Sequence, residues 1–255
     1  MPNESTEAIY DANADRWARR ERVLLSDFTA RPRVIEALSP LSGAHVLDLG
    51  CGEGYVARLV AEAGAASVFG IDVSSEMVEN ARRAIPADTA CAMQFDAADA
   101  STYTGFPRPA FDRVMAVFLF NYLTRAQMTA VMRTARERLA PGGRFVFTVP
   151  HPCLPYMRET APPFYFETEG HDYFGGVDTT YEGRIWRRDG QSVPVRCVHK
   201  TFSDYFTALA EAGFTSMPTV SELHVTDEHL AFDPAFFEPL RGYPLHVMFQ
   251  VEKPQ

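Results

Sequence analysis

Cysteine is scarce in this sequence, and long apolar runs are missing. The four cysteines, at positions 51, 91, 153 and 197, are widely spaced and form no Cys-x-x-Cys pair, which argues against a zinc site of paired thiolates and against a redox dithiol. The longest strongly apolar run covers residues 114–120, whereas a helix needs about 20 apolar residues to cross a bilayer. We therefore expect free thiols, no metal site and no membrane span.

Positive charge is also in short supply. The 255 residues include 24 lysines and arginines against 33 acids, a net charge of −9, which disfavours nucleic acid as a partner because phosphate contacts dominate that affinity. Two arginine clusters, in residues 16–22 and 184–188, are expected to be solvated faces. The first 17 residues have neither a basic start nor an apolar centre, so we expect no secretory signal and a cytoplasmic location.

The most informative segment is residues 46–55, VLDLGCGEGY, which joins an apolar strand to a glycine-rich turn. Gly50, Gly52 and Gly54 permit a tight turn and a close approach of the backbone to a ligand. Their spacing is Gly-x-Gly-x-Gly, whereas a dinucleotide fingerprint is Gly-x-Gly-x-x-Gly. Asp48 and Glu53 would repel a pyrophosphate at short range. The segment therefore favours a cationic ligand over a dinucleotide.

Asp48, Gly50, Cys51, Gly52 and Gly54 match, position by position, the first motif of a known enzyme family. The chain resembles the class I methyltransferases that use S-adenosylmethionine, in which a hydrophobic strand is followed by Asp-x-Gly-Cys-Gly-x-Gly. The resemblance implies S-adenosyl-L-methionine as the cofactor, with these five residues in its binding site.

The fold implied by the resemblance and by the apolar pattern is α/β, a doubly wound, Rossmann-like sheet of seven strands, mostly parallel with an antiparallel last strand. Strands are expected at residues 46–49, 67–73, 92–95, 111–118, 144–149, 218–226 and 245–252, and helices at 55–64, 124–140 and 203–212. We divide the chain into an N-terminal helical lid (1–40), a cofactor-binding core (41–150), a substrate cap (151–201) and the C-terminal part of the core (202–255).

Further cofactor contacts are expected where the next three strands end. Asp72 ends the second strand, where a carboxylate accepts hydrogen bonds from both ribose hydroxyls; an N-cap of the following helix is the alternative. The resemblance implies that Met77 packs on the adenine. It also implies that Asp96 and the backbone of Ala97 meet the adenine ring, with Asp99 as the weaker candidate. The predicted set after the glycine turn is Asp72, Val73, Met77, Asp96, Ala97 and Ala116.

An insertion follows the fifth strand. Residues 151–176 are rich in proline and aromatic residues without a helical period, and residues 180–201 predict a β-hairpin around Asp189 and Gly190, a pair suited to a type I′ turn. Irregular segments of this length are usually functional. Aromatic rings stack on planar groups, so we expect a planar or apolar acceptor here, although most of the rings would form the cap's own core. These rings are Tyr156, Phe164, Tyr165, Phe166, Tyr173, Phe174, Tyr181 and Trp186.

Three residues are candidates for the chemistry on the acceptor. His151 follows the fifth strand, where the methyl group is expected to point, and is the candidate base; a loop histidine tied to the backbone is the alternative. Tyr10 lies on a predicted helix over residues 9–20, which resembles the helix that closes over the methionine end in many small-molecule methyltransferases. Asn121 comes just after the fourth strand. His246 is expected to be structural.

These features predict an S-adenosylmethionine-dependent methyltransferase that acts on a small molecule, as a monomer or a homodimer. Residues 119–122 and 234–237 resemble the toxoflavin-pathway N-methyltransferases, which modify an azapteridine ring. N-methylation of a heteroaromatic or another secondary metabolite is therefore the leading expectation. The alternatives are O- or C-methylation of a small metabolite and a protein that binds S-adenosylmethionine without transferring the methyl group.

Overall fold

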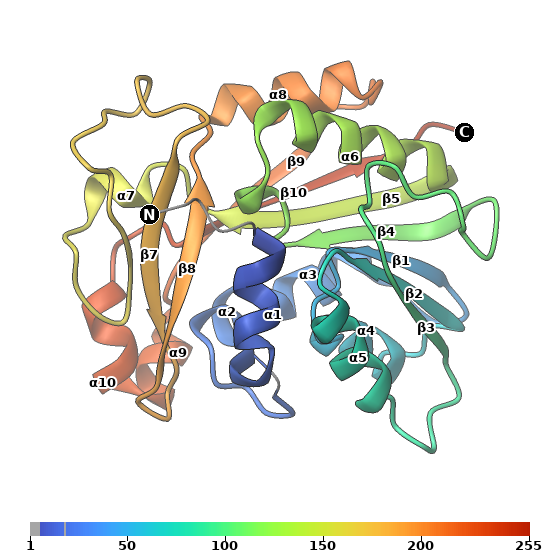
Figure 1. Ribbon diagram of the computed structural model, residues 1–255, viewed down its shortest axis with the longest axis horizontal. Helices are drawn as coiled ribbons and strands as arrows, with labels where there is room; N and C mark the ends of the chain where they lie inside the picture. The colour runs from blue at the N-terminus through green and yellow to red at the C-terminus, as the bar shows by residue number, and fades with distance from the viewer. Residues whose placement is uncertain (1–5, 18) are drawn as a thin grey trace.

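The computed structural model describes residues 6–17 and 19–255, and within the first of these segments it describes the side chains of residues 8, 11, 12, 14, 16 and 17. A seven-stranded sheet with the order β3-β2-β1-β4-β5-β10-β9 forms its centre (Figure 1). Neighbouring strands from β3 to β5 run parallel, and β10 runs antiparallel to both β5 and β9. The prediction of a doubly wound, Rossmann-like sheet with an antiparallel last strand is confirmed.

The bounds of the main elements follow the apolar pattern closely. The strands of the sheet are β1 (His45–Leu49), β2 (Ser67–Asp72), β3 (Ala92–Ala97), β4 (Phe111–Val117), β5 (Leu139–Pro150), β9 (Thr219–Leu223) and β10 (His246–Glu252). The helices that cover the sheet are α3 (Arg31–Leu38), α4 (Tyr55–Glu62), α5 (Ser75–Arg83), α6 (Arg125–Arg138) and α8 (Phe202–Glu211).

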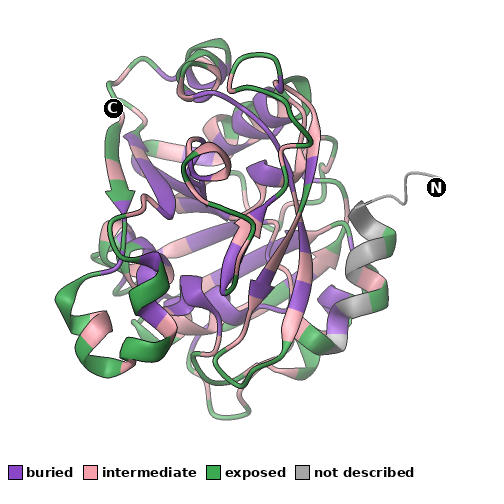
Figure 2. Cartoon of the chain, turned by 90° about the vertical axis from the view of Figure 1, so that its left-hand side faces the viewer, coloured by how far each residue is buried: buried purple, intermediate pink, exposed green. Residues whose placement is uncertain are grey.

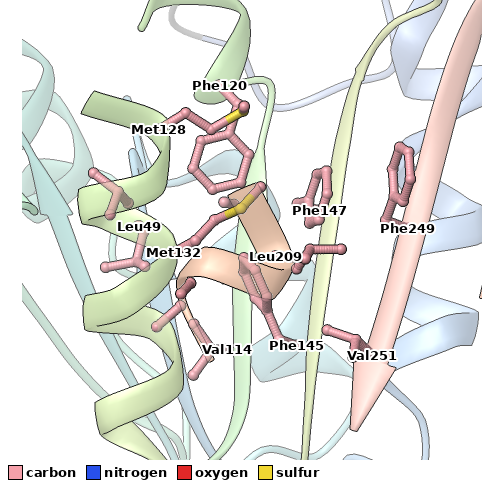
Figure 3. Packing of buried hydrophobic residues seen from close by; sticks show 14 of the residues in the cluster. Leu49, Val114, Phe120, Met128, Met132, Phe145, Phe147, Leu209, Phe249 and Val251 are labelled. Atoms are coloured by element: carbon pink, nitrogen blue, oxygen red, sulfur yellow. The ribbon is translucent and has the colours of Figure 1, made fainter. Parts of the chain in front are cut away.

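Both faces of the sheet are buried, as expected for parallel strands without alternating polarity (Figure 2). Helices α6 and α8 cover one face, where Met132 and Leu209 pack with Phe145 and Phe147 (Figure 3). Helices α3, α4 and α5 cover the other face. Burying one apolar side chain of this size stabilises the folded chain by roughly 1.5–3 kcal/mol. The two helical layers therefore fix the position of the sheet.

The cap has a sheet of its own. Strands β6 (Phe164–Phe166), β7 (Thr180–Trp186) and β8 (Ser192–Val198) pair antiparallel, and the predicted hairpin around Asp189 and Gly190 is confirmed. The predicted type I′ turn is wrong, because only Gly190 of this pair has a positive φ, +85°, and a type I′ turn needs a positive φ at both residues. Together with α7 (Leu154–Met157), α9 (Asp227–Phe232), α10 (Pro234–Phe237) and the short helix η2 (Glu238–Leu240), these strands share a separate apolar cluster that contains Phe164, Phe166 and Tyr181. Several aromatic rings of the cap therefore form its own apolar core, as expected from the sequence.

The N-terminal helices α1 (Thr6–Trp17) and α2 (Leu25–Thr29) lie between the sheet and the cap (Figure 1). The Asp11 carboxylate accepts a hydrogen bond of 2.5 Å from the Ser74 hydroxyl at the start of α5. The Arg187 guanidinium, at the end of the hairpin, donates to the Arg16 carbonyl at 2.8 Å. Helix α1 is thus tied to the core at one point and to the cap at another.

Several predicted boundaries are wrong, among them the start of β5 and the start of α8. Strand β5 begins at Leu139, immediately after α6, so residues 141–143 lie within the strand instead of stopping the helix. Helix α8 begins one residue before the predicted start, because Thr201 is its N-cap and Asp204 accepts a hydrogen bond from the Thr201 backbone N–H at 2.8 Å. In the part of the chain that the structure describes, no helix has the length and apolar character to cross a membrane.

Candidate active site

A cavity of about 410 Å³ opens at the carboxyl ends of β1, β2 and β4. Doubly wound sheets bind ligands at this edge, where the strand order reverses, and here the reversal falls between β1 and β4. The walls of the cavity come from the core, from the N-terminal helices and from the cap. Segments far apart in the sequence therefore meet around one space.

The glycine turn after β1 forms one end of the cavity. The backbone N–H groups of Gly50 and Cys51 donate to the Ile71 carbonyl at 2.8 and 3.0 Å, which fixes the turn against β2. Gly50 and Gly52 have φ values of +74° and +52°, in the left-handed region that favours glycine. A Cβ on Gly50 would lie 2.9 Å from the Leu119 side chain, whereas a Cβ on Gly52 would meet nothing within 4 Å. Gly52 therefore faces open space in which a ligand can contact the backbone.

Two carboxylates, the buried Asp48 and the half-buried Asp72, stand beside this turn. Asp72 accepts hydrogen bonds from the N–H groups of Gly52 at 2.8 Å and Ser74 at 3.0 Å, and each of its oxygens keeps a lone pair for a hydroxyl. Burial raises the pKa of both carboxyls, and with the added charge of Asp72 it raises the pKa of Asp48 to about 8. A nearby cation would favour the ionised carboxylates. This end of the cavity suits a ligand that carries a cationic group and hydroxyls.

The opposite end is walled by aromatic and polar side chains. Phe118, just after β4, has a φ of +60°, a conformation that is rare for a bulky residue and is typical of functional sites. Its ring centre lies 5.1 Å from that of His246 and 5.3 Å from the guanidinium carbon of Arg31. Phe164 and Phe166 of the cap line the same space. The cap thus contributes two flat side chains to the cavity.

Three side chains at this end have buried polar atoms without a hydrogen-bond partner among the described residues. The atoms are both ring nitrogens of His246, Oδ1 of Asn121 on the short helix η1 (Phe120–Tyr122), and Nε of Arg31. Burial, with the positive charge of Arg31, lowers the pKa of His246 to about 3, so the imidazole is neutral at physiological pH. Each unpaired buried polar group costs about 1–3 kcal/mol, and such groups in native proteins call for an explanation, such as a functional role or a bound water, ion or ligand.

Comparison with known proteins agrees with this geometry. Residues 46–143 match the family model of the methyltransferase domain. The aklanonic acid methyltransferase DauC of Streptomyces sp. strain C5 is 35% identical over 46% of this chain and 53% of its own length. The trans-aconitate 2-methyltransferase of Streptomyces avermitilis is 34% identical over 57% of this chain and 56% of its own. The crystal structure of an S-adenosylmethionine-dependent methyltransferase from Mesorhizobium loti is 26% identical, with a TM-score of 0.63 over 89% of this chain and 99% of that one. Residues 46–143 are thus similar to the methyltransferase domain, and the sheet is similar to that of an S-adenosylmethionine-dependent methyltransferase.

The similar structure from Mesorhizobium loti is S-adenosylmethionine-dependent, and the first end of the cavity has features that suit this cofactor. The open space at Gly52, the free lone pairs of Asp72 and the raised pKa of Asp48 are the features that a ribose and a cation would use. The chain spans about half the length of the curated relatives it matches, 53% and 56% for the two named above.

Most of the predicted cofactor residues line the cavity. They are Asp48, Gly50, Cys51, Gly52, Asp72, Val73 and Met77. Gly54 has another role, because it precedes α4 with a φ of +75° and a Cβ there would lie 3.1 Å from Ala81. Ala116 is buried in the core on the α6 face, while Val117 lines the cavity, because successive side chains of a strand point to opposite faces. Gly54 and Ala116 are therefore not among the described residues that line the cavity, and a cofactor contact at either residue stays a prediction.

At the third strand the weaker candidate, Asp99, lines the cavity, whereas the favoured candidates do not. The Asp96 carboxylate accepts a hydrogen bond of 2.5 Å from the Tyr103 hydroxyl, and neither Asp96 nor Ala97 is among the described residues around the cavity. Ala98 and Asp99 line it instead. The reason is that β3 continues in register beside β2 as far as Ala97, so the chain reaches the edge of the sheet only afterwards.

The predicted base, His151, is held by other residues of the protein. Its Nε2 is 2.8 Å from the Glu222 carboxylate and its Nδ1 accepts from the Cys153 N–H at 3.2 Å, so both ring nitrogens already have protein partners. It is also not one of the described residues that line the cavity. The structure thus argues against the predicted base and agrees with the alternative of a tethered loop histidine. Asn121 does line the cavity, and the side chain of Tyr10 lies outside the described residues.

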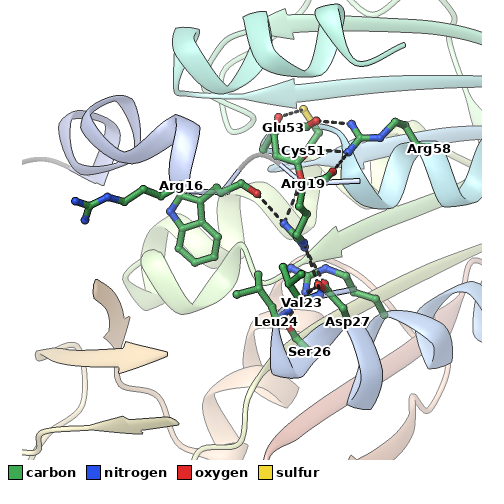
Figure 4. A network of polar contacts seen from close by, with 12 residues as sticks. Arg16, Arg19, Val23, Leu24, Ser26, Asp27, Cys51, Glu53 and Arg58 are labelled. Carbon is green, nitrogen blue, oxygen red and sulfur yellow. Dashed lines mark hydrogen bonds and ion pairs between the residues drawn. The ribbon is translucent and has the colours of Figure 1, made fainter. Parts of the chain in front are cut away.

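Two features of the site were missed. Arg19, assigned to a solvated face, is largely buried and donates to Asp27 at 2.8 and 3.0 Å and to Glu53 at 3.0 Å, while Arg58 donates to Glu53 at 2.7 Å (Figure 4). The charge of Glu53 is thus balanced by arginines and is not left for the cofactor. The second feature is His246, which lines the cavity although it was expected to be structural. The position of His246 could have been predicted from the sequence, because an antiparallel last strand begins at the edge of the sheet where β5 ends.

Proposed function

We propose that this protein transfers the methyl group of S-adenosylmethionine to a small-molecule acceptor. The observation that carries the proposal is a single cavity with two unlike ends. One end has the glycine turn and the carboxylates of Asp48 and Asp72, and the other has aromatic walls and unpaired polar atoms. A protein that only bound the cofactor would not need the second end.

The residues at the first end would hold the cofactor. Asp72 would accept hydrogen bonds from the ribose hydroxyls, Asp48 would face the positive charge, and Met77 would pack on the adenine, with Ala98 and Asp99 beyond it. S-adenosylmethionine supplies a methyl carbon that is activated by its bond to a sulfonium sulfur. The protein then has to orient the acceptor and exclude water, because alignment of the reacting atoms accounts for much of the rate of such a displacement.

The residues at the second end would orient the acceptor. Phe118, Phe164 and Phe166 provide flat apolar surfaces, which favour a planar molecule. Asn121, through its unpaired Oδ1, would accept a hydrogen bond from an N–H or O–H group of that molecule. We further propose that residues 151–201 act as a substrate cap and residues 1–40 as a lid, since both contribute side chains to the walls.

The leading acceptor class is a heteroaromatic that is methylated on nitrogen, or another secondary metabolite. The flat walls and the acceptor oxygen of Asn121 support it, as does the partial resemblance of residues 119–122 and 234–237 to the toxoflavin-pathway N-methyltransferases. The matching relatives named for aklanonic acid and trans-aconitate support small organic acceptors in general. O- and C-methylation are therefore included as arms of the test.

The test measures cofactor binding and product formation separately. Calorimetry should show binding of S-adenosylmethionine, and incubation with a panel of heteroaromatic N–H compounds, phenols and carboxylic acids should yield S-adenosylhomocysteine and a methylated product by mass spectrometry. Asp72→Asn should weaken cofactor binding by roughly tenfold, since a charge-assisted hydrogen bond contributes about 1.5–3 kcal/mol, while the exposed Asp88→Asn should not. Binding without any product across the panel would instead indicate a non-methylating binder, and absence of binding would overturn the proposal.

A further inference from the structure

We propose that the acceptor is a planar acid that binds as its anion, with its ionised atom held between Arg31 and His246. The inference rests on the proposed function and deepens it, because it gives the charge of the acceptor and the two residues that select it. Both residues line the cavity and lie beside Phe118, which follows β4.

Arg31 brings positive charge to this part of the cavity. Its Nη1 donates to the Ser26 hydroxyl and, at 2.8 Å, to the Asp27 carboxylate, but that carboxylate is also bound by Arg19. Arg19, Arg31 and Arg58 share the two carboxylates of Asp27 and Glu53, which leaves one positive charge uncompensated within this network.

Asp48 does not cancel that charge in the free protein. Arg31 acts on Asp48 electrostatically, yet burial and the charge of Asp72 outweigh it and raise the pKa of Asp48 to about 8, so the neutral carboxyl is favoured at neutral pH. When the cationic cofactor binds, its own charge is available to balance the ionised Asp48. The positive charge of Arg31 is therefore left for the acceptor in both states.

His246 supplies a hydrogen-bond donor at the same place. It is 2% exposed, and its ring stands between Phe118, at 5.1 Å, and Phe164, at 5.9 Å between ring centres. A neutral imidazole always carries one N–H, and neither nitrogen of His246 has a partner among the described residues. Because Phe118 contacts both the His246 ring and the Arg31 guanidinium, an acceptor stacked on Phe118 has both groups within reach.

The low polarity of the cavity walls strengthens the attraction between an anionic acceptor and the cationic cofactor. Opposite charges attract more strongly where aromatic side chains exclude water, so an anion is drawn towards the cationic cofactor. The acceptor loses its proton to solvent before it binds. The new bond then uses the lone pair of the ionised atom, and the electron pair of the broken carbon–sulfur bond stays on sulfur. No protein base is required, which agrees with the tethered His151.

The experiment uses protein saturated with S-adenosylhomocysteine and a matched pair of probes, 2-naphthoate and 2-naphthamide. The two have the same flat ring system and nearly the same shape, but only the naphthoate is an anion at neutral pH. Calorimetric titration should give a Kd for naphthoate at least about tenfold below that for naphthamide, because hydrogen bonds between ionised partners are roughly twice as strong as neutral ones.

Variants assign the preference to the two residues. In Arg31→Met the tenfold preference should fall below about twofold, while Arg33→Met, an exposed arginine on the same helix that pairs with Glu36, should keep it. His246→Phe keeps the ring but loses the donor, so naphthoate should bind roughly threefold more weakly with naphthamide unchanged. His151→Phe should leave both probes unaffected. Arg31→Lys keeps the positive charge but replaces the planar guanidinium with an ammonium group. Comparison of the Lys and Met variants therefore separates the loss of charge from misfolding of Arg31→Met.

The outcomes separate this inference from the proposed function. Failure of S-adenosylhomocysteine to bind would count against the proposed function itself. If the loaded protein binds naphthamide as tightly as naphthoate, binds neither probe, or keeps its preference in folded Arg31→Met, the anionic acceptor is overturned. A preference that survives in Arg31→Lys and Arg33→Met but is lost in Arg31→Met supports it.

Discussion

Gly52 and Gly43 share a backbone conformation but differ in what surrounds them. Both have positive φ, +52° and +73°, and a Cβ on either would meet nothing within 4 Å. Only Gly52 lines the cavity. We expect Gly52→Ala and Gly43→Ala each to lower the free energy of unfolding by about 1–2 kcal/mol, the cost of a left-handed L-residue. Only Gly52→Ala should also weaken S-adenosylhomocysteine binding, by tenfold or more in calorimetry. Equal cofactor affinities in the two variants would contradict the role of this open space.

We expect the ionisation of Asp48 to release a proton when the cofactor binds. Burial and the neighbouring Asp72 raise the pKa of Asp48 to about 8, so the carboxyl is mostly protonated at pH 7 in the free protein. A sulfonium nearby favours the ionised carboxylate, and S-adenosylhomocysteine lacks that charge. We expect S-adenosylmethionine to release up to about one proton on binding at pH 7, and more than S-adenosylhomocysteine does.

Calorimetry in two buffers of different ionisation enthalpy measures this release. Asp48→Asn removes the titrating carboxyl with little change in shape, so its binding should release no such proton. If the wild type and Asp48→Asn release the same number of protons, another group is responsible.

Among the elements, α1 is the one whose position depends on a few polar contacts. Asp11 accepts from the Ser74 hydroxyl at 2.5 Å, and Arg187 of the hairpin donates to the Arg16 carbonyl at 2.8 Å. Among the described side chains of this helix, Ala14 is buried and Trp17 packs against the apolar cluster of the cap. Elements joined to the rest of a protein through exposed polar contacts open locally at low free-energy cost and often serve as lids.

We expect Asp11→Ala to raise hydrogen exchange in α1 by roughly threefold to tenfold, the effect of one lost hydrogen bond of about 0.5–1.5 kcal/mol. Exchange in α6 should not change, because this helix packs on the far face of the sheet. The affinity for S-adenosylmethionine should fall, since Ser74 lies next to the cofactor end of the cavity. Unchanged exchange in α1 would show that the helix is held by other contacts.

The elements of the core could be predicted from sequence because their signals are local. The apolar run of β1, the glycine turn and the stripe of α4 each lie within ten residues, and the structure has them in place. The acceptor end could not be predicted in this way. Arg31 lines the cavity because of the way α3 packs on the sheet. Asp96 does not line it, because β3 extends two residues beyond its predicted end. Neither event leaves a periodic signal in the sequence.

At the scale of the whole molecule, stability at different pH values adds the contributions of buried titratable groups. Burial lowers the pKa of His246 from 6.5 to about 3, so between these values only the unfolded chain binds the proton, and stability rises with pH. Asp48 behaves in the opposite way. Its pKa is raised from 3.8 to about 8, so the folded chain holds the proton in this window, and stability falls as pH rises through it.

The two windows overlap between about pH 4 and 6.5, where the slopes oppose each other, whereas from about 6.5 to 8 the raised pKa of Asp48 makes stability fall. Burial also lowers the pKa values of His151 and His199, which adds to the rise below pH 6.5. Urea unfolding of the cofactor-free protein should therefore give a maximum near pH 6.5 and a decline of up to about 1.4 kcal/mol per pH unit above it. Asp48→Asn should abolish the decline, and His246→Phe should extend it to lower pH. A wild-type stability that rises from pH 6.5 to 8 would mean that Asp48 is ionised in the folded protein.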